Sequence, residues 1–185
     1  MDSTPIWKDV PAPHFEPLYR DTNVDVVVIG AGVTGLTAAQ TLSQAGFKVC
    51  LLERGRIGSG ETGNTTSHLT SFIDAKLLDL VKTYGEGNST AIWHAGEVAI
   101  SHIEETVRRY LIDCDFVRCP GYQHASIERA PDKSCREEYQ QEAEQAQKLG
   151  FDVEYIDSVP IFAVPGIKVE SQARIHPLRY LHGLA

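Results

Sequence analysis

The chain has 185 residues, enough to bury one core of moderate size and to form one domain with part of another. Its formal net charge of −8 at pH 7 argues against partners such as nucleic acid or an anionic membrane surface. No apolar run approaches the roughly 20 residues of a transmembrane helix, and no signal peptide is visible. The four cysteines have no metal-site or C-x-x-C spacing, so we expect a cytoplasmic protein without a bound metal.

The first segment, residues 1–23, is rich in proline, which prevents a helix and predicts an extended arm. Trp7 and Phe15 are its two candidate anchors. A loosely packed leader is the simpler interpretation of this arm.

Residues 24–53 carry the pattern around which the rest of the chain is organised. Val24–Ile29 is a run rich in β-branched residues, typical of a buried parallel strand. A helical pattern follows and ends at Gly46, and a second apolar strand spans Lys48–Leu52. This order predicts a strand–helix–strand unit.

Between the first strand and the helix, Gly30, Gly32 and Gly35 have G-x-G-x-x-G spacing. Gly30 permits the tight turn, Gly32 lets the backbone approach a pyrophosphate, and Gly35 lets the helix pack close to the sheet. The pyrophosphate would lie at the helix N-terminus, where free N–H groups favour negative charge. Glu53 follows the second strand and can accept hydrogen bonds from a ribose diol, so the pattern predicts dinucleotide binding. Its charge would repel the 2′-phosphate of NADP, which disfavours NADP, although Arg54 and Arg56 argue the other way; FAD and NAD remain.

A polar loop follows Glu53 at residues 54–72 and is rich in Gly, Ser and Thr. It leaves the carboxyl end of the second strand, the edge where open α/β sheets bind ligands. Its hydroxyl and backbone N–H groups suit phosphates and sugar hydroxyls, and a polar loop of this length is usually functional. A solvated surface loop is the alternative interpretation.

The remaining elements follow from periodicity and turn signals. The first of them are helices at 73–84 and from Asn88 or Ser89 to about 111, followed by strands at 115–118 and 122–127 joined by a Pro120-Gly121 turn. Then come a polar and exposed helix at 131–149, a short strand or loop at 152–157, an extended stretch at 164–175 and a helix at 177–184.

Two groups of polar side chains on these elements are expected to be structural. The first has His-x-x-Glu spacing along one helix, which is not the Glu-x-x-His spacing of carboxylate-bridged metal helices, so a solvated face is expected for His94, Glu97, His102 and Glu105. For the second group we expect packing roles, and it comprises Tyr122, His124 and His176.

With GAGVTG and GSGETGNTTSHLT, the sequence resembles the FAD-dependent oxidoreductases of the D-amino-acid oxidase, glycine oxidase and sarcosine oxidase group. Within this group it looks most like members with a C-terminal Rieske domain. DFVRCPGYQHAS is similar to the first strands of the family's substrate domain, and QARIHPLRYLHGLA to its return segment into the flavin domain.

The resemblance implies an α/β fold, in which a FAD-type Rossmann (βαβ) unit precedes the start of an α+β substrate domain. It divides the chain into an arm at 1–23, a FAD-binding part at 24–112, the beginning of the substrate domain at 113–170 and a return segment at 171–185.

The same resemblance implies the cofactor site. The residues that would hold the pyrophosphate are Gly30, Gly32, Val33, Thr34 and Gly35. Glu53 would bind the adenosine ribose, and Arg54 would lie by the adenosine. Those that would run along the pyrophosphate and ribityl chain are Thr62, Asn64, Thr65 and Thr66. Some relatives bind FAD covalently through a histidine of this loop, where this chain has Thr65, so we expect noncovalent FAD.

The implied activity is oxidation of an amine or amino-acid C–N bond, with electrons passed to oxygen or to a Rieske 2Fe-2S cluster in a C-terminal part. We expect the chain to be an N-terminal fragment, so that catalytic residues stay unassigned and a complementing subunit is one conceivable partner. The alternatives are an NAD-dependent dehydrogenase and a non-catalytic nucleotide-binding fragment.

Overall fold

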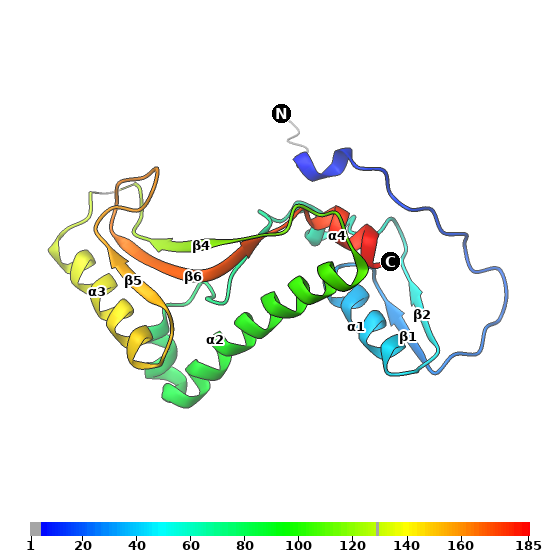
Figure 1. Ribbon diagram of the computed structural model, residues 1–185, viewed down its shortest axis with the longest axis horizontal. Coiled ribbons are helices and arrows are strands. Elements are labelled where there is room, and N and C mark those ends of the chain that lie inside the picture. The colour runs from blue at the N-terminus through cyan, green and yellow to red at the C-terminus, as the bar shows by residue number, and fades with distance from the viewer. Residues whose placement is uncertain (1–4, 129) are drawn as a thin grey trace. The chain divides into compact units, whose positions relative to one another are not determined.

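The structure, a computed structural model, describes residues 5–128 and 130–185 (Figure 1). Within it the chain forms two compact units. Unit 1 comprises residues 5–68, 105–116 and 175–185, and unit 2 comprises the described residues of 69–104 and 117–174. Across these described residues, no helix combines the length and the apolar character that crossing a bilayer would require.

Unit 1 contains the strand–helix–strand order that the glycine pattern predicts. Strand β1 (Val26–Ile29) and strand β2 (Val49–Leu52) are parallel neighbours, joined by helix α1 (Val33–Gln44) (Figure 1). Val26 lies opposite Val49, and Ile29 lies opposite Leu52. Gly46 follows the helix with a φ of +90°, a conformation that favours glycine and ends the helix there.

The prediction that β1 is buried is wrong for the described chain. Its residues alternate between half-buried and exposed, and Ile29 is 86% exposed. The physical reason is that successive side chains of a strand point to opposite faces of the sheet. Val28 lies on the face beside α1, where a Cβ on Gly35 would come within 3.5 Å of it, whereas Val27 and Ile29 lie on the opposite, exposed face.

Unit 1 also contains helix α4 (Pro177–Leu184) and the short 3₁₀ helix η1 (Ile6–Asp9). Proline occupies the first turn of α4, where a missing N–H costs nothing. Leu178 and Leu181 face Gly58 in the loop after β2, so closely that a side chain at Gly58 would collide with them. Helix α4 therefore packs against the loop that the sequence predicts to be functional.

Unit 2 is built on an antiparallel sheet. Strand β6 (Gly166–Arg174) pairs with β4 (Val117–His124) along one edge and with β5 (Val153–Ile156) along the other (Figure 1). The two-residue strand β3 (His68–Leu69) also neighbours β6. Ile167 and Val169 of β6 belong to a core that includes Trp93 and Phe151.

The sequence predicts two strands and a Pro120-Gly121 turn where the structure has the single strand β4. The chain continues straight through the proline, and the pairing register with β6 shifts between Cys119 and Gly121. Pro120 of β4 lies opposite two residues of β6, Glu170 and Ser171, so the extra residue of this bulge is in β6, where Ser171 has a φ of 59°. The turn signal therefore marks an irregular pairing within one strand, at a proline that has no N–H to donate to the ladder.

Two helices complete unit 2. Helix α2 (Leu77–Tyr110), of which residues 77–104 belong to this unit, is interrupted at Gly85 (φ 81°, ψ 163°), close to the predicted break. Helix α3 (Lys133–Lys148) covers one face of β5 and β6 (Figure 1). The prediction that this helix is exposed is wrong, because one of its faces is buried through Tyr139, Glu142, Ala143 and Ala146.

The buried carboxylate of Glu142 explains how so polar a helix can pack. It accepts hydrogen bonds from the backbone N–H groups of Leu77 and Leu78, which are unpaired donors at the start of α2. Burial raises the pKa of Glu142, while these two N–H groups oppose the increase. Glu142 thus acts as an N-cap supplied by another helix.

Candidate functional site

The turn after β1 brings the predicted glycines into close contact. Gly30 has a φ of +100°, and its N–H donates to the carbonyl of Leu52 at 2.8 Å. A Cβ atom on Gly35 would lie 1.9 Å from the carbonyl oxygen of Gly30, so the helix can start here only with glycine at this position. A Cβ on Gly32 would lie 3.2 Å from the Oγ1 of Thr62, a tight contact that a small shift could relieve.

The N-terminus of α1 presents backbone donors at this turn. The N–H of Val33 donates to the Oγ1 of Thr62 at 3.3 Å, and the N–H of Leu36 makes the first helical bond to Gly32 at 3.0 Å. The N–H groups of Thr34 and Gly35 lie between these two, in the first turn, where a helix has no carbonyl to receive them. Such a helix end favours an anion such as a pyrophosphate.

Glu53 ties the end of β2 to the glycine turn. Its Oε2 accepts from the N–H of Ala31 at 2.9 Å, and its Oε1 accepts from the N–H of Gly55 at 2.6 Å. These N–H groups, Ala31 first, lower the pKa of Glu53, and the charge of Arg54 adds to the effect. Because its pKa is lowered, Glu53 is ionised at neutral pH. Each carboxylate oxygen can accept more than one hydrogen bond, so Glu53 can still accept one from a hydroxyl.

The loop after Glu53 folds back onto the glycine turn. The N–H of Gly58 donates to the carbonyl of Ala31 at 3.0 Å. A Cβ on Gly63 would lie 2.3 Å from the Gly58 carbonyl oxygen, which requires glycine within the short helix η2 (Glu61–Asn64). This fold places Thr62 beside the start of α1. Three further predicted residues follow it at exposed positions, and they are Asn64, Thr65 and Thr66.

A cavity of about 1260 Å³ lies within unit 1 beside Glu53 and Arg54. Its walls come from the arm at residues 12–20, from β2 and from Leu36, Ala39 and Gln40 of α1. It borders the carboxylate at the end of β2, the position that the sequence assigns to a ribose. Its volume is ample for a nucleoside, since small-molecule sites typically measure about 300–1,000 Å³.

One contact of this loop is not visible in the sequence. The indole N–H of Trp7 donates to the carbonyl of Thr65 at 2.9 Å, and its ring meets the His176 ring edge-to-face at 5.4 Å. The sequence indicates Trp7 as an anchor, but no local pattern could reveal a partner 58 residues away.

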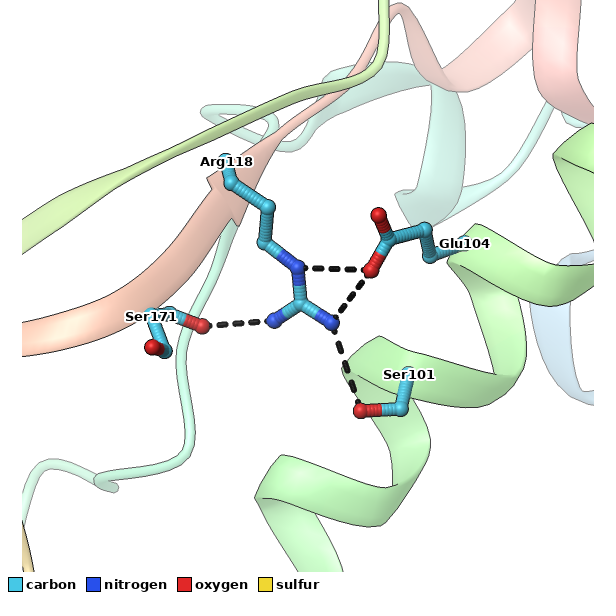
Figure 2. A network of polar contacts seen from close by, with 4 residues as sticks. All are labelled: Ser101, Glu104, Arg118 and Ser171. Atoms are coloured by element: carbon cyan, nitrogen blue, oxygen red, sulfur yellow. Dashed lines mark hydrogen bonds and ion pairs between the residues drawn. The ribbon is translucent and has the colours of Figure 1, made fainter.

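In unit 2, the polar residues make contacts of a structural kind. Arg118 of β4 donates to Glu104 through Nε (2.9 Å) and Nη2 (2.7 Å), to the Ser101 hydroxyl (3.3 Å) and to the Ser171 carbonyl (2.6 Å), as Figure 2 shows. The network joins β4 to α2 and β6. His124 lies 2.7 Å from the carbonyl of Ala125 through Nδ1.

The four residues considered as metal ligands all lie on α2, and they are His94, Glu97, His102 and Glu105. His94 pairs with Glu97 at 2.8 Å on an exposed face. Over the described ranges, no three His, Cys, Asp or Glu side chains gather closely enough to hold a metal ion.

The geometry of unit 1 fits a dinucleotide with an unphosphorylated ribose. The N-terminus of α1 directs backbone N–H groups to the glycine turn, and Glu53 supplies an ionised acceptor beside a large cavity. The chain belongs to the family described as DAO, FAD dependent oxidoreductase, which matches residues 25–185. The resemblance and the α/β fold class inferred from the sequence are therefore confirmed. The arm before residue 25 lies outside the match.

Relatives known by sequence agree with this assignment. The chain is 32% identical over 181 residues to YhfW of Bacillus subtilis (strain 168), which carries the name Rieske 2Fe-2S iron-sulfur protein; the match covers 96% of this chain and 35% of YhfW. It is 35% identical over 106 residues to the gamma-glutamylputrescine oxidoreductase of Escherichia coli (strain K12), covering 55% of this chain and 24% of that protein. The chain therefore spans about a third of the length of YhfW.

Solved structures share the fold. The L-amino acid deaminase of Proteus myxofaciens superposes with a TM-score of 0.70 at 14% identity, covering 95% of this chain and 38% of that one. The glycine oxidase of Geobacillus kaustophilus gives a TM-score of 0.59 at 19% identity, and the superposition covers 88% of this chain and 43% of that one.

Proposed function

We propose that this chain supplies the FAD-binding part of an oxidoreductase that oxidises the C–N bond of an amine or an amino acid. The observation that carries the proposal is Glu53, whose carboxylate is held against the glycine turn by the N–H of Ala31 at 2.9 Å. An acidic residue at this place suits a ribose diol and disfavours NADP. The names of the relatives, an amine oxidoreductase, an amino acid deaminase and a glycine oxidase, support the substrate class.

In this proposal the residues around the turn bind the pyrophosphate by their backbone N–H groups, and they are Gly30, Gly32, Val33, Thr34 and Gly35. Glu53 accepts from the adenosine ribose, and Arg54 lies by the adenosine in the adjoining cavity. The polar loop contacts the pyrophosphate and the ribityl chain through Thr62, Asn64, Thr65 and Thr66. The exposed positions of Thr34, Asn64, Thr65 and Thr66 keep these groups accessible to a ligand.

When bound, FAD would accept the hydride that leaves the carbon next to the substrate nitrogen, and water would then hydrolyse the imine product. The chain's own residues contribute binding and orientation. We propose that FAD is held noncovalently, because Thr65 stands at the loop position where some relatives have a linking histidine. Oxygen, or a Rieske centre elsewhere in the whole protein as the name of YhfW suggests, would take the electrons. A cytoplasmic location agrees with four unpaired cysteine thiols.

The test is a titration of the chain with FAD in which binding is measured as quenching of flavin fluorescence. NAD and NADP serve as competitors. Gly35→Ala should abolish binding, because its Cβ would overlap the Gly30 carbonyl oxygen. Gly60→Ala, in the polar loop, is the control for a glycine-to-alanine change, since no atom lies within 4 Å of its Cβ and its φ is negative.

Binding of NAD rather than FAD would favour the dehydrogenase alternative. Equal FAD affinity of Gly35→Ala and Gly60→Ala would contradict the assignment of the glycine turn. For noncovalent FAD, acid precipitation should release the yellow colour into the supernatant; colour retained in the pellet would contradict it.

A further inference from the structure

The start of the arm makes a specific contact with the polar loop, and both lie in unit 1. In η1, the side chains of Ile6, Lys8 and Asp9 are exposed, whereas Trp7 turns inward. Its indole N–H donates to the Thr65 carbonyl at 2.9 Å. A residue of the arm therefore reaches the part of the loop assigned above to the ribityl chain.

The loop around Thr65 needs restraint from outside. Ser67 is buried and has a φ of +71°, a left-handed conformation that is costly for a residue other than glycine. Its N–H donates to the Thr65 hydroxyl at 3.3 Å, a contact within the same turn. The carbonyl of Ser67 accepts from the N–H of Ile175 at 3.3 Å, so the segment before α4 holds one end of this turn.

Trp7 holds the other end of the turn and joins it to the same segment. The Trp7 ring packs edge-to-face on His176, the residue that follows Ile175. His176 is itself fixed, because its N–H donates to the Cys114 carbonyl at 2.7 Å and its Nδ1 accepts from the N–H of Arg179 at 3.3 Å as the N-cap of α4. The Thr65–Ser67 turn is thus held at both ends by contacts to the segment that starts α4, directly through Ile175 and through Trp7 to His176.

We propose that Trp7 is a positioning residue for the cofactor site, which fixes the Thr65–Ser67 turn in the conformation that receives FAD. The inference rests on the proposed function and extends it to an arm that the family match does not include. Removing the restraint lets the turn relax from its strained form, so each binding event must order it again. Trp7 then affects FAD affinity without touching the cofactor.

The experiment compares Trp7→Phe with Ile6→Ala in the full 185-residue chain. Phenylalanine keeps an aromatic ring for His176 but loses the N–H donor, while Ile6 is 74% exposed in the same short helix and serves as the control. One lost hydrogen bond predicts a dissociation constant for FAD raised about fivefold in Trp7→Phe and unchanged in Ile6→Ala. Trp7→Ala, which also loses the ring contact, should weaken binding further.

A second readout needs no cofactor. Amide hydrogen exchange at Ser67 and Ile175 should be faster in the Trp7→Phe apoprotein than in the parent chain, while the thermal midpoint is nearly unchanged. Equal FAD affinity of the parent and Trp7→Phe would overturn the inference and leave the proposed function intact. Failure of the parent chain to bind FAD would overturn both.

Discussion

Strands β6 of unit 2 and β1 of unit 1 have opposite surroundings. Strand β6 of unit 2 has neighbours on both edges, and its Ile167 is fully buried under α3 and Trp93. Strand β1 of unit 1 is paired with β2 alone among the described strands, and its Ile29 is 86% exposed. Ile167 thus belongs to the main apolar core, which lies in unit 2, whereas unit 1 combines buried apolar residues such as Leu36 and Leu181 with polar contacts around the glycine turn and the loop. A ligand bound at the glycine turn should therefore increase the stability of unit 1 more than that of unit 2.

The largest expected effect comes from one substitution made in both strands. Ile167→Thr should lower the free energy of unfolding of unit 2 by about 2–5 kcal/mol, because it removes buried methyl groups and buries a hydroxyl. Ile29→Thr keeps the β-branched shape on an exposed surface and should change stability by about 0.5 kcal/mol or less. Urea unfolding monitored by hydrogen exchange in each unit measures both. Similar losses for the two variants would refute the contrast.

A smaller effect is expected from the network in Figure 2. Arg118→Lys keeps the charge but cannot donate to Glu104 through two nitrogens while also reaching the Ser171 carbonyl. We expect a loss of about 1–2 kcal/mol in unit 2, since the pair is only partly exposed. Arg109→Lys, in an exposed pair with Glu105, is the control and should change little. Equal effects of the two variants would mean that the network adds nothing beyond a surface ion pair.

The smallest effect is a difference in pH dependence between two carboxylates. The folded-state pKa of Glu53 is lowered by the N–H groups of Ala31 and Gly55, so its contribution is present above about 4.5 and is lost as the pH falls through the lowered pKa. Burial raises the pKa of Glu142, so its contribution is complete below about 4.5 and is lost as the pH rises through the raised pKa.

The stability of each unit between pH 3 and pH 7 should therefore respond differently to the two amide variants. Glu53→Gln should reduce the acid sensitivity of unit 1, and Glu142→Gln should reduce the loss of stability of unit 2 on going from mildly acidic to neutral pH. The difference between variant and parent at each pH isolates the single group. Slopes of the same sign for both groups would contradict the assignment.

Short-range patterns predict unit 1 better than unit 2. The turn at Gly30, the helix after it and Glu53 are predictable because each depends on spacing within about thirty residues. The burial of α3 is not, because Glu142 reads as a surface residue until its two backbone partners at the start of α2 are known. Likewise, Pro120-Gly121 signals a turn locally, and only the pairing with β6 shows that the strand continues there, opposite a bulge in β6. Long-range contacts decide these cases.

The candidate site shows the same division. Its glycines and Glu53 follow from the motif, while the tie between Trp7 and Thr65 joins residues 58 positions apart. The roles of the glycines, of Glu53 and Arg54 and of the loop residues in FAD binding all stay predictions.

Hydrogen exchange of the chain with and without FAD tests the central claim most directly. FAD at about 100 times its dissociation constant should stabilise the state that binds it by about 2.7 kcal/mol. We expect slower exchange at residues 30–36 and 62–67 of unit 1, with α3 and β6 of unit 2 nearly unchanged. An unchanged exchange pattern in unit 1, or protection confined to unit 2, would contradict the assignment of the flavin site to the glycine turn.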